Sequence, residues 1–93
     1  MGERFVDDDD GYESWLGANP SGYVINAERQ PRPKYLMLHR ATCPTISGTP
    51  AHGRSWTKDY LKYCAASRED AAGWCQSTVG RGPKPCGRCM GGH

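Results

Sequence analysis

The sequence predicts a small α+β domain that a bound metal ion, rather than a large core, holds together. The 93 residues include 12 Gly and 7 Pro, and only 37% are hydrophobic. A core of this size supplies only roughly 3–5 kcal/mol unaided. Short apolar runs change between strand and helix periodicity, and Cys and His residues form two groups far apart in the chain. We expect a flexible acidic leader over residues 1–10, one domain over residues 11–89 and a flexible tail over residues 90–93.

A short helix is predicted at the start of the domain, from about residue 11 to residue 18. Asp10 is a suitable N-cap and Glu13 follows three residues later, which is the capping-box spacing. Tyr12, Trp15 and Leu16 fall on one helical stripe. A turn containing Pro and Gly ends this helix.

Two strands and a hairpin should follow. Residues 23–26 and 35–38 are rich in β-branched, aromatic and aliphatic side chains, and a Pro-containing segment separates them. His39 then comes directly from the end of the second strand. Residues 59–65 fit either a strand or a helix; we favour a third antiparallel strand, with Lys62 and Cys64 on the same side.

A second helix is predicted from Ser67 to about residue 78. Ser67 is a suitable N-cap, and Ala71, Trp74 and Cys75 form an apolar stripe. The segment after it is rich in Gly and Pro, so it ends the helix and leads to a Cys-x2-Cys knuckle.

Four ligand-type side chains occur in two separate segments: His39 with Cys43, and Cys86 with Cys89. Two residues between thiolates suit a zinc knuckle, and one His with three Cys completes a closed tetrahedral site. Structural zinc contributes on the order of 10–16 kcal/mol in small peptides near neutral pH. We therefore predict one structural Zn²⁺ and a fold that depends on it.

Other roles for the cysteines stay open. A disulfide framework is one, although five cysteines is an odd number and no secretory signal precedes them. A redox pair is another, although that motif normally opens a helix, and only four residues follow Cys89. Cys64 is an alternative ligand to His39. Otherwise Cys64 and Cys75 are expected to be buried as small hydrophobic residues.

Charge is distributed unevenly along the chain. Residues 1–13 hold six of the ten acids and one base, so residues 14–93 carry eleven bases and four acids, a net charge of +7. This excess favours a polyanionic partner, although a plain solvated surface would also account for it. Trp56, flanked by cations, suits stacking on a base or packing beneath its own loop. The candidate nucleic-acid contacts are Arg29, Arg32, Arg40, Arg54, Trp56, Lys58, Arg81, Lys84 and Arg88.

The spacing of His39 and Cys43, the Ala-containing second helix and the segment Lys84-Pro85-Cys86-Gly87-Arg88-Cys89 resemble the zinc-binding domain of Ada-type DNA repair proteins. The resemblance covers about residues 35–89 and implies a zinc-stabilised DNA-binding module, associated with DNA repair, modification or restriction. In that family the first ligand is a cysteine that accepts a methyl group from a DNA phosphotriester. His39 stands at that position here, so methyl transfer is not expected.

Three classes of function follow, in order of preference. The first is a non-catalytic zinc-binding module that binds DNA, and the alternative is a zinc-stabilised adaptor for a protein partner. An enzyme is the least supported class, because four protein ligands would leave no open position on the metal. The sequence has no apolar run long enough to span a membrane, so we expect a cytoplasmic protein.

Overall fold

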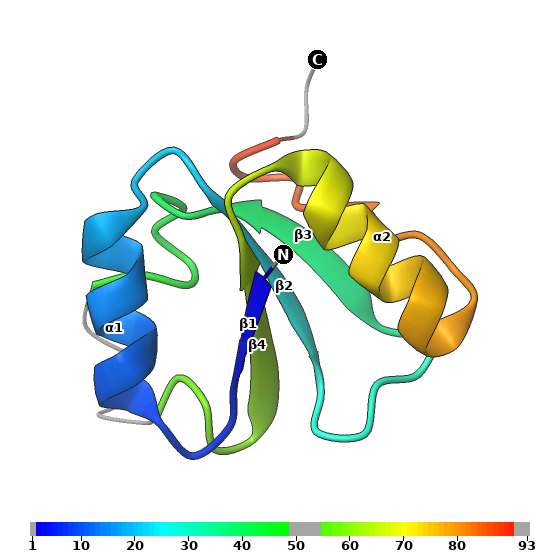
Figure 1. The fold of residues 1–93 in the computed structure, drawn as a ribbon, viewed down its shortest axis with the longest axis horizontal. Helices are drawn as coiled ribbons and strands as arrows, with labels where there is room; N and C mark the ends of the chain where they lie inside the picture. Colours follow the sequence, from blue (N-terminus) through cyan, green and yellow to red (C-terminus); the bar gives the residue numbers. More distant parts are fainter. Residues whose placement is uncertain (1, 49–54, 91–93) are drawn as a thin grey trace.

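The computed structural model describes residues 2–48 and 55–90. Along this part of the chain the elements are β1 (Gly2–Phe5), α1 (Asp9–Ala18), β2 (Tyr23–Glu28), β3 (Leu36–Arg40), β4 (Tyr60–Ala65), α2 (Arg68–Val79) and β5 (Lys84–Pro85). The predicted α+β class is confirmed, and the ambiguous segment before residue 65 is a strand. Figure 1 shows the sheet standing between the two helices. Neither described helix is long and apolar enough to cross a bilayer.

The five strands form one sheet in the order β1-β4-β2-β3-β5. β2 and β3 make the predicted hairpin, in which Val24 lies opposite His39 and Ile25 opposite Leu38. β4 pairs antiparallel with β2 on one side and with β1 on the other, whereas β5 joins β3 in parallel. The last two segments of the described chain, β5 and the knuckle, are thereby attached to the strand that carries His39.

Each face of the sheet packs against one helix. Ile25, Leu38 and Leu61 pack with Ala71 and Cys75 of α2. On the other face Val24 and Cys64 pack with Tyr12 of α1 and with Cys43 and Cys86. Since alternate residues of a strand point to opposite faces, β2 is apolar on both sides and lies at the centre of the molecule.

The N-terminal segment differs from the prediction of a flexible leader over residues 1–10. Residues 2–5 form the edge strand β1, in which Phe5 lies opposite Lys62 and is only 7% exposed. The sequence analysis did not predict β1 because three of its four residues are polar or glycine, and Phe5 is the one residue of the strand that is buried. Asp7, which follows β1, forms a 2.8 Å ion pair with Arg29.

Helix α1 begins earlier than predicted because Asp8, not Asp10, is its N-cap. The Asp8 carboxylate accepts a 2.9 Å hydrogen bond from the backbone N–H of Gly11. Helix α2 confirms its prediction: the Ser67 hydroxyl accepts from the Asp70 N–H at 3.1 Å. At its end Gly80 adopts a φ of 75°, a left-handed conformation that glycine adopts without steric cost.

Asp9 connects the start of α1 to the segment before β4. One carboxylate oxygen accepts hydrogen bonds from the Ser55 hydroxyl and from both the N–H and hydroxyl of Thr57, and the other accepts from the Trp56 N–H at 2.9 Å. Burial opposes ionisation of this carboxylate. The four hydrogen bonds outweigh burial and lower the pKa of Asp9 to about 2.

Asp9→Asn should lower the free energy of unfolding at neutral pH by about 1–2 kcal/mol, because the amide offers one acceptor oxygen instead of two. A depressed folded-state pKa stabilises the fold above the unfolded value of 3.8, and this stability is lost as pH falls from there toward 2. Urea denaturation at pH 7 measures the first effect. The change in the wild type–variant difference as the pH is lowered, over the range in which both proteins keep their metal and stay folded, measures the second. The neighbouring exposed Asp10→Asn is the matched control, and equal stability of the two variants would contradict the assignment.

Candidate metal centre

The structure brings together the four side chains that the sequence proposes as metal ligands. The ligand atoms of His39, Cys43, Cys86 and Cys89 all lie within 4.8 Å of one another. The first three residues are buried and Cys89 is partly exposed. One His and three Cys converging at this separation form a group positioned to hold a metal ion.

His39 and Cys43 are positioned by β3 and the turn that follows it. His39 is the penultimate residue of the strand and lies opposite Val24 on the α1 side of the sheet. The Cys43 N–H donates to the Arg40 carbonyl at 2.9 Å, which turns the chain back. The Cys43 carbonyl then accepts hydrogen bonds from the Ile46 N–H and the Ser47 hydroxyl. A strand end and a hydrogen-bonded turn therefore hold the first two ligands.

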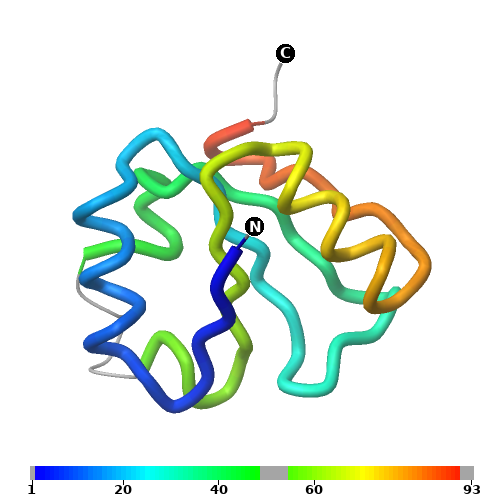
Figure 2. Tube along the Cα trace, in the orientation of Figure 1, coloured from blue at the N-terminus to red at the C-terminus, as the bar shows by residue number. Residues whose placement is uncertain are grey.

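The knuckle is attached directly to β3. The Cys86 N–H donates to the Leu38 carbonyl at 2.8 Å, which continues the β3–β5 pairing by one residue. The Met90 N–H donates to the Cys86 carbonyl at 2.9 Å and closes the turn that contains Cys89. Because Leu38 precedes His39, this pairing places both Cys residues beside the first two ligands. Figure 2 shows the C-terminal segment running close to β3.

Backbone N–H groups point at two of the sulfur atoms. The Arg88 N–H lies 3.4 Å from Cys86 Sγ, and the Arg40 N–H lies 3.3 Å from Cys89 Sγ. Burial raises the pKa of Cys86, but N–H groups of the knuckle and the neighbouring thiols bring it below its ordinary value. Burial and the nearby thiols raise the pKa of Cys89 to about 11. The lowered pKa of Cys86 favours its thiolate, and a bound cation would stabilise a second thiolate at Cys89 beside it.

The surroundings of His39 fit a metal ligand. Burial, followed by the positive charge of Lys62, lowers the pKa of His39 to about 4, so the ring is neutral near pH 7, as coordination requires. Its Nε2 atom is buried and has no hydrogen-bond partner in the described part of the chain. A buried polar atom without a partner is costly, and coordination of a cation gives the imidazole such a partner.

Thr45 is a neighbour of the cluster that the sequence did not single out. Its hydroxyl lies 3.0 Å from Cys43 Sγ and 3.4 Å from His39 Nδ1. Groups that hold metal ligands in this way fix the orientation of a ring or thiolate. The only signal in the sequence is a hydroxyl residue two positions after a candidate ligand, which is too common to be informative.

Cys64 and Cys75 do not join the cluster. Both are fully buried, one in each hydrophobic cluster, and all five cysteines are free thiols. Burial raises the pKa of Cys75 to about 11 and that of Cys64 further. They behave as small hydrophobic residues, and the group of potential metal ligands contains His39 rather than Cys64.

The candidate nucleic-acid contacts differ in whether an acidic side chain already engages them. Arg29 and Arg32 are engaged in ion pairs with Asp7 and Glu28, respectively, at 2.8 and 2.9 Å. Arg40, Arg81, Lys84 and Arg88 are exposed and have no acidic partner within residues 2–48 and 55–90. The same holds for Lys34, which precedes β3 and was not among the candidates. Lys58 is exposed as well, and Arg54 lies outside the described residues.

Trp56 packs against the hydrophobic cluster that contains the metal ligands. Its ring lies edge-on to Tyr12 at 6.4 Å, and its indole N–H donates to the Gly48 carbonyl at 3.3 Å. Of the two roles predicted for Trp56, these contacts agree with packing beneath its own loop rather than stacking on a base.

Comparisons with protein-family models, with curated proteins and with solved structures found no match for this chain. The metal centre therefore has to be interpreted from its own geometry and chemistry.

Proposed function

We propose that the protein is a non-catalytic, zinc-stabilised module that binds DNA through its phosphates. Three thiols and an imidazole favour Zn²⁺ over Mg²⁺ or Ca²⁺, which prefer oxygen ligands. Four protein ligands complete a tetrahedral shell and leave no position for a substrate, so the metal has a structural role in this proposal. The resemblance to Ada-type domains agrees with such a module, with His39 in place of the alkyl acceptor.

The distribution of exposed charge supports DNA as the partner. Five exposed cations without an acidic partner lie along the β3–β5 edge, and Arg4, Lys58 and Arg68, which also lack an ion pair within the described residues, are scattered elsewhere. Glu3 and the acids of residues 7–13 belong to β1, α1 and the connection between them. β1 and β5 are opposite edges of the sheet, so the charge asymmetry of the sequence becomes an asymmetry in space. A cationic edge of this kind attracts a polyanion and steers its approach.

The same surface offers little to an apolar protein partner. Among the residues that the structure describes, Tyr60 is the one large hydrophobic side chain that is exposed, at 44%. Docking surfaces for protein partners usually contain a contiguous apolar patch. The charged edge therefore favours DNA over the adaptor alternative.

Binding to single- and double-stranded DNA at 50 to 200 mM salt tests the proposal. If three cations contact phosphates of duplex DNA, log K should fall with log salt with a slope near −2.7, or about 40-fold over this range. Charge reversal of Arg81, Lys84 and Arg88 to Glu should abolish binding while metal content and circular dichroism stay unchanged. Absence of binding to either form of DNA at 50 mM salt would rule out the proposal.

A further inference from the structure

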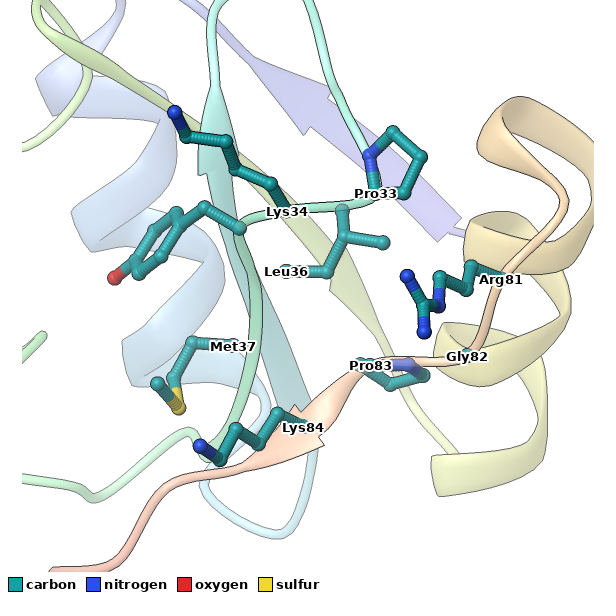
Figure 3. Close-up of a pocket in the computed structure, with 9 residues that line it drawn as sticks. Pro33, Lys34, Leu36, Met37, Arg81, Gly82, Pro83 and Lys84 are labelled. Carbon is teal, nitrogen blue, oxygen red and sulfur yellow. The ribbon is translucent and has the colours of Figure 1, made fainter.

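A pocket lies at the β3–β5 edge, between the end of the β2–β3 connection and the segment that joins α2 to β5. Its volume is about 370 Å³, within the range of sites for small organic ligands. Pro33, Lys34 and Leu36 line one side, and Arg81, Pro83 and Lys84 line the other. Figure 3 shows the Arg81 guanidinium reaching toward Leu36 and the Lys84 side chain extending toward Met37, whereas Lys34 points away from Arg81.

All charged side chains that line the pocket are cationic. Its lining includes three cations, Lys34, Arg81 and Lys84, and no acidic residue. None of the three forms an ion pair or a side-chain hydrogen bond with another described residue, whereas nearby Arg32 pairs with Glu28 at 2.9 Å. Cations that the protein does not neutralise at a concave site favour an anionic ligand, and Arg in particular suits phosphate.

The remaining walls are apolar and rigid. Leu36 is 4% exposed and belongs to the core under α2. Tyr35 is held in place, since its hydroxyl accepts a 2.9 Å hydrogen bond from Asn26 and its ring lies 5.7 Å from that of Tyr60. Pro33 and Pro83 add two restricted rings. Pro33, Met37 and Pro83 keep apolar surface in contact with water at the pocket, so a ligand that carries an apolar or aromatic part beside its charge would cover more of the lining than a simple inorganic anion.

We propose that this pocket binds one unpaired nucleotide, with its phosphate on Arg81 and Lys84 and its nucleoside against Leu36, Met37 and Pro83. The nucleotide is either an unpaired residue of a DNA strand or a free mononucleotide. The first of these two sources rests on the proposed function. A base inside a duplex is stacked on both sides and cannot enter a pocket, whereas an unpaired base can.

NMR titration of the metal-loaded protein with thymidine monophosphate, thymidine and inorganic phosphate, at constant ionic strength, tests this proposal. Thymidine monophosphate should shift the amide resonances of Leu36, Met37, Gly82 and Lys84, and the other two compounds should bind at least tenfold more weakly. Single-stranded DNA should bind more tightly than a blunt duplex of equal length. The double variant Arg81→Gln/Lys84→Gln should lose at least tenfold in nucleotide affinity and also lose this preference.

Arg4→Gln/Arg68→Gln is the matched control, because it removes the same charge from exposed positions outside the pocket. Equal binding of phosphate and thymidine monophosphate, or normal nucleotide affinity in the pocket variant, would overturn the proposal. If DNA binds without any preference for single strands and thymidine monophosphate leaves the pocket amides unshifted, the pocket proposal fails and the DNA proposal stands. If the nucleotide binds the pocket and no DNA binds, the proposed function fails and the free nucleotide is the ligand.

Discussion

Cys86→Ser is expected to abolish metal binding at stoichiometric concentration and, with it, the cooperative fold. Cys86 is 7% exposed, is the ligand attached to β3 through the Leu38 carbonyl, and lies 4.0 Å from Cys43 Sγ. A structural zinc contributes on the order of 10–16 kcal/mol, which exceeds the roughly 3–5 kcal/mol of a core this small. Metal analysis of the purified protein and thermal unfolding followed by circular dichroism measure the two effects.

Cys75→Ala is the matched control for this variant. Cys75 is also a fully buried thiol, but it belongs to the cluster under α2 and not to the group of ligands. Its loss should cost about 1 kcal/mol for the small cavity and leave one metal per chain. A chelator should unfold the wild type and Cys75→Ala alike. A Cys86→Ser protein that folds without metal and unfolds at the wild-type temperature would show that the metal is not what stabilises the fold.

The elements with strong local signals could be predicted from the sequence. Ser67 and Gly80 mark the ends of α2 by residue type alone, and the β-branched run from Tyr23 predicts β2. The metal cluster was predictable for a similar reason, since Cys-x2-Cys and His-x3-Cys place each pair of ligands within one turn. The two pairs meet because the Cys86 N–H donates to the Leu38 carbonyl. The ligand spacing predicts that the pairs meet, but it does not predict which backbone contact joins them.

The elements that sequence reasoning missed are those that depend on distant partners. β5 has only two residues, one of them Pro85, and exists because β3 offers it an open edge. β1 is concealed by Glu3 and Arg4, which are exposed at the other edge of the sheet. Likewise, the pairing of Arg29 with Asp7 joins residues 22 positions apart, so the set of cations without partners could only be found in the structure.

Lys62 presents a buried charge that neither its residue type nor its position in β4 predicts. The side chain is 3% exposed, and its ammonium donates a 2.6 Å hydrogen bond to the Trp56 carbonyl. Burial lowers the pKa of Lys62 to about 8, against smaller opposing influences of Asp9 and Cys64. Lys62 therefore loses its proton at a lower pH in the folded protein than in the unfolded chain, where its pKa is 10.5.

Raising the pH from 8 to 10.5 should stabilise the folded protein through Lys62 by up to about 3 kcal/mol, because the unfolded chain binds more protons in this window. Lys62→Met should remove this gain. The buried Tyr12 and Cys64 have raised pKa values and act in the opposite direction. The difference in unfolding free energy between wild type and Lys62→Met, measured by urea denaturation at each pH, therefore reports Lys62 together with its coupling to Cys64. The exposed Lys58→Met should follow the wild type throughout, and parallel pH profiles for wild type and Lys62→Met would show that the ammonium is solvated rather than buried.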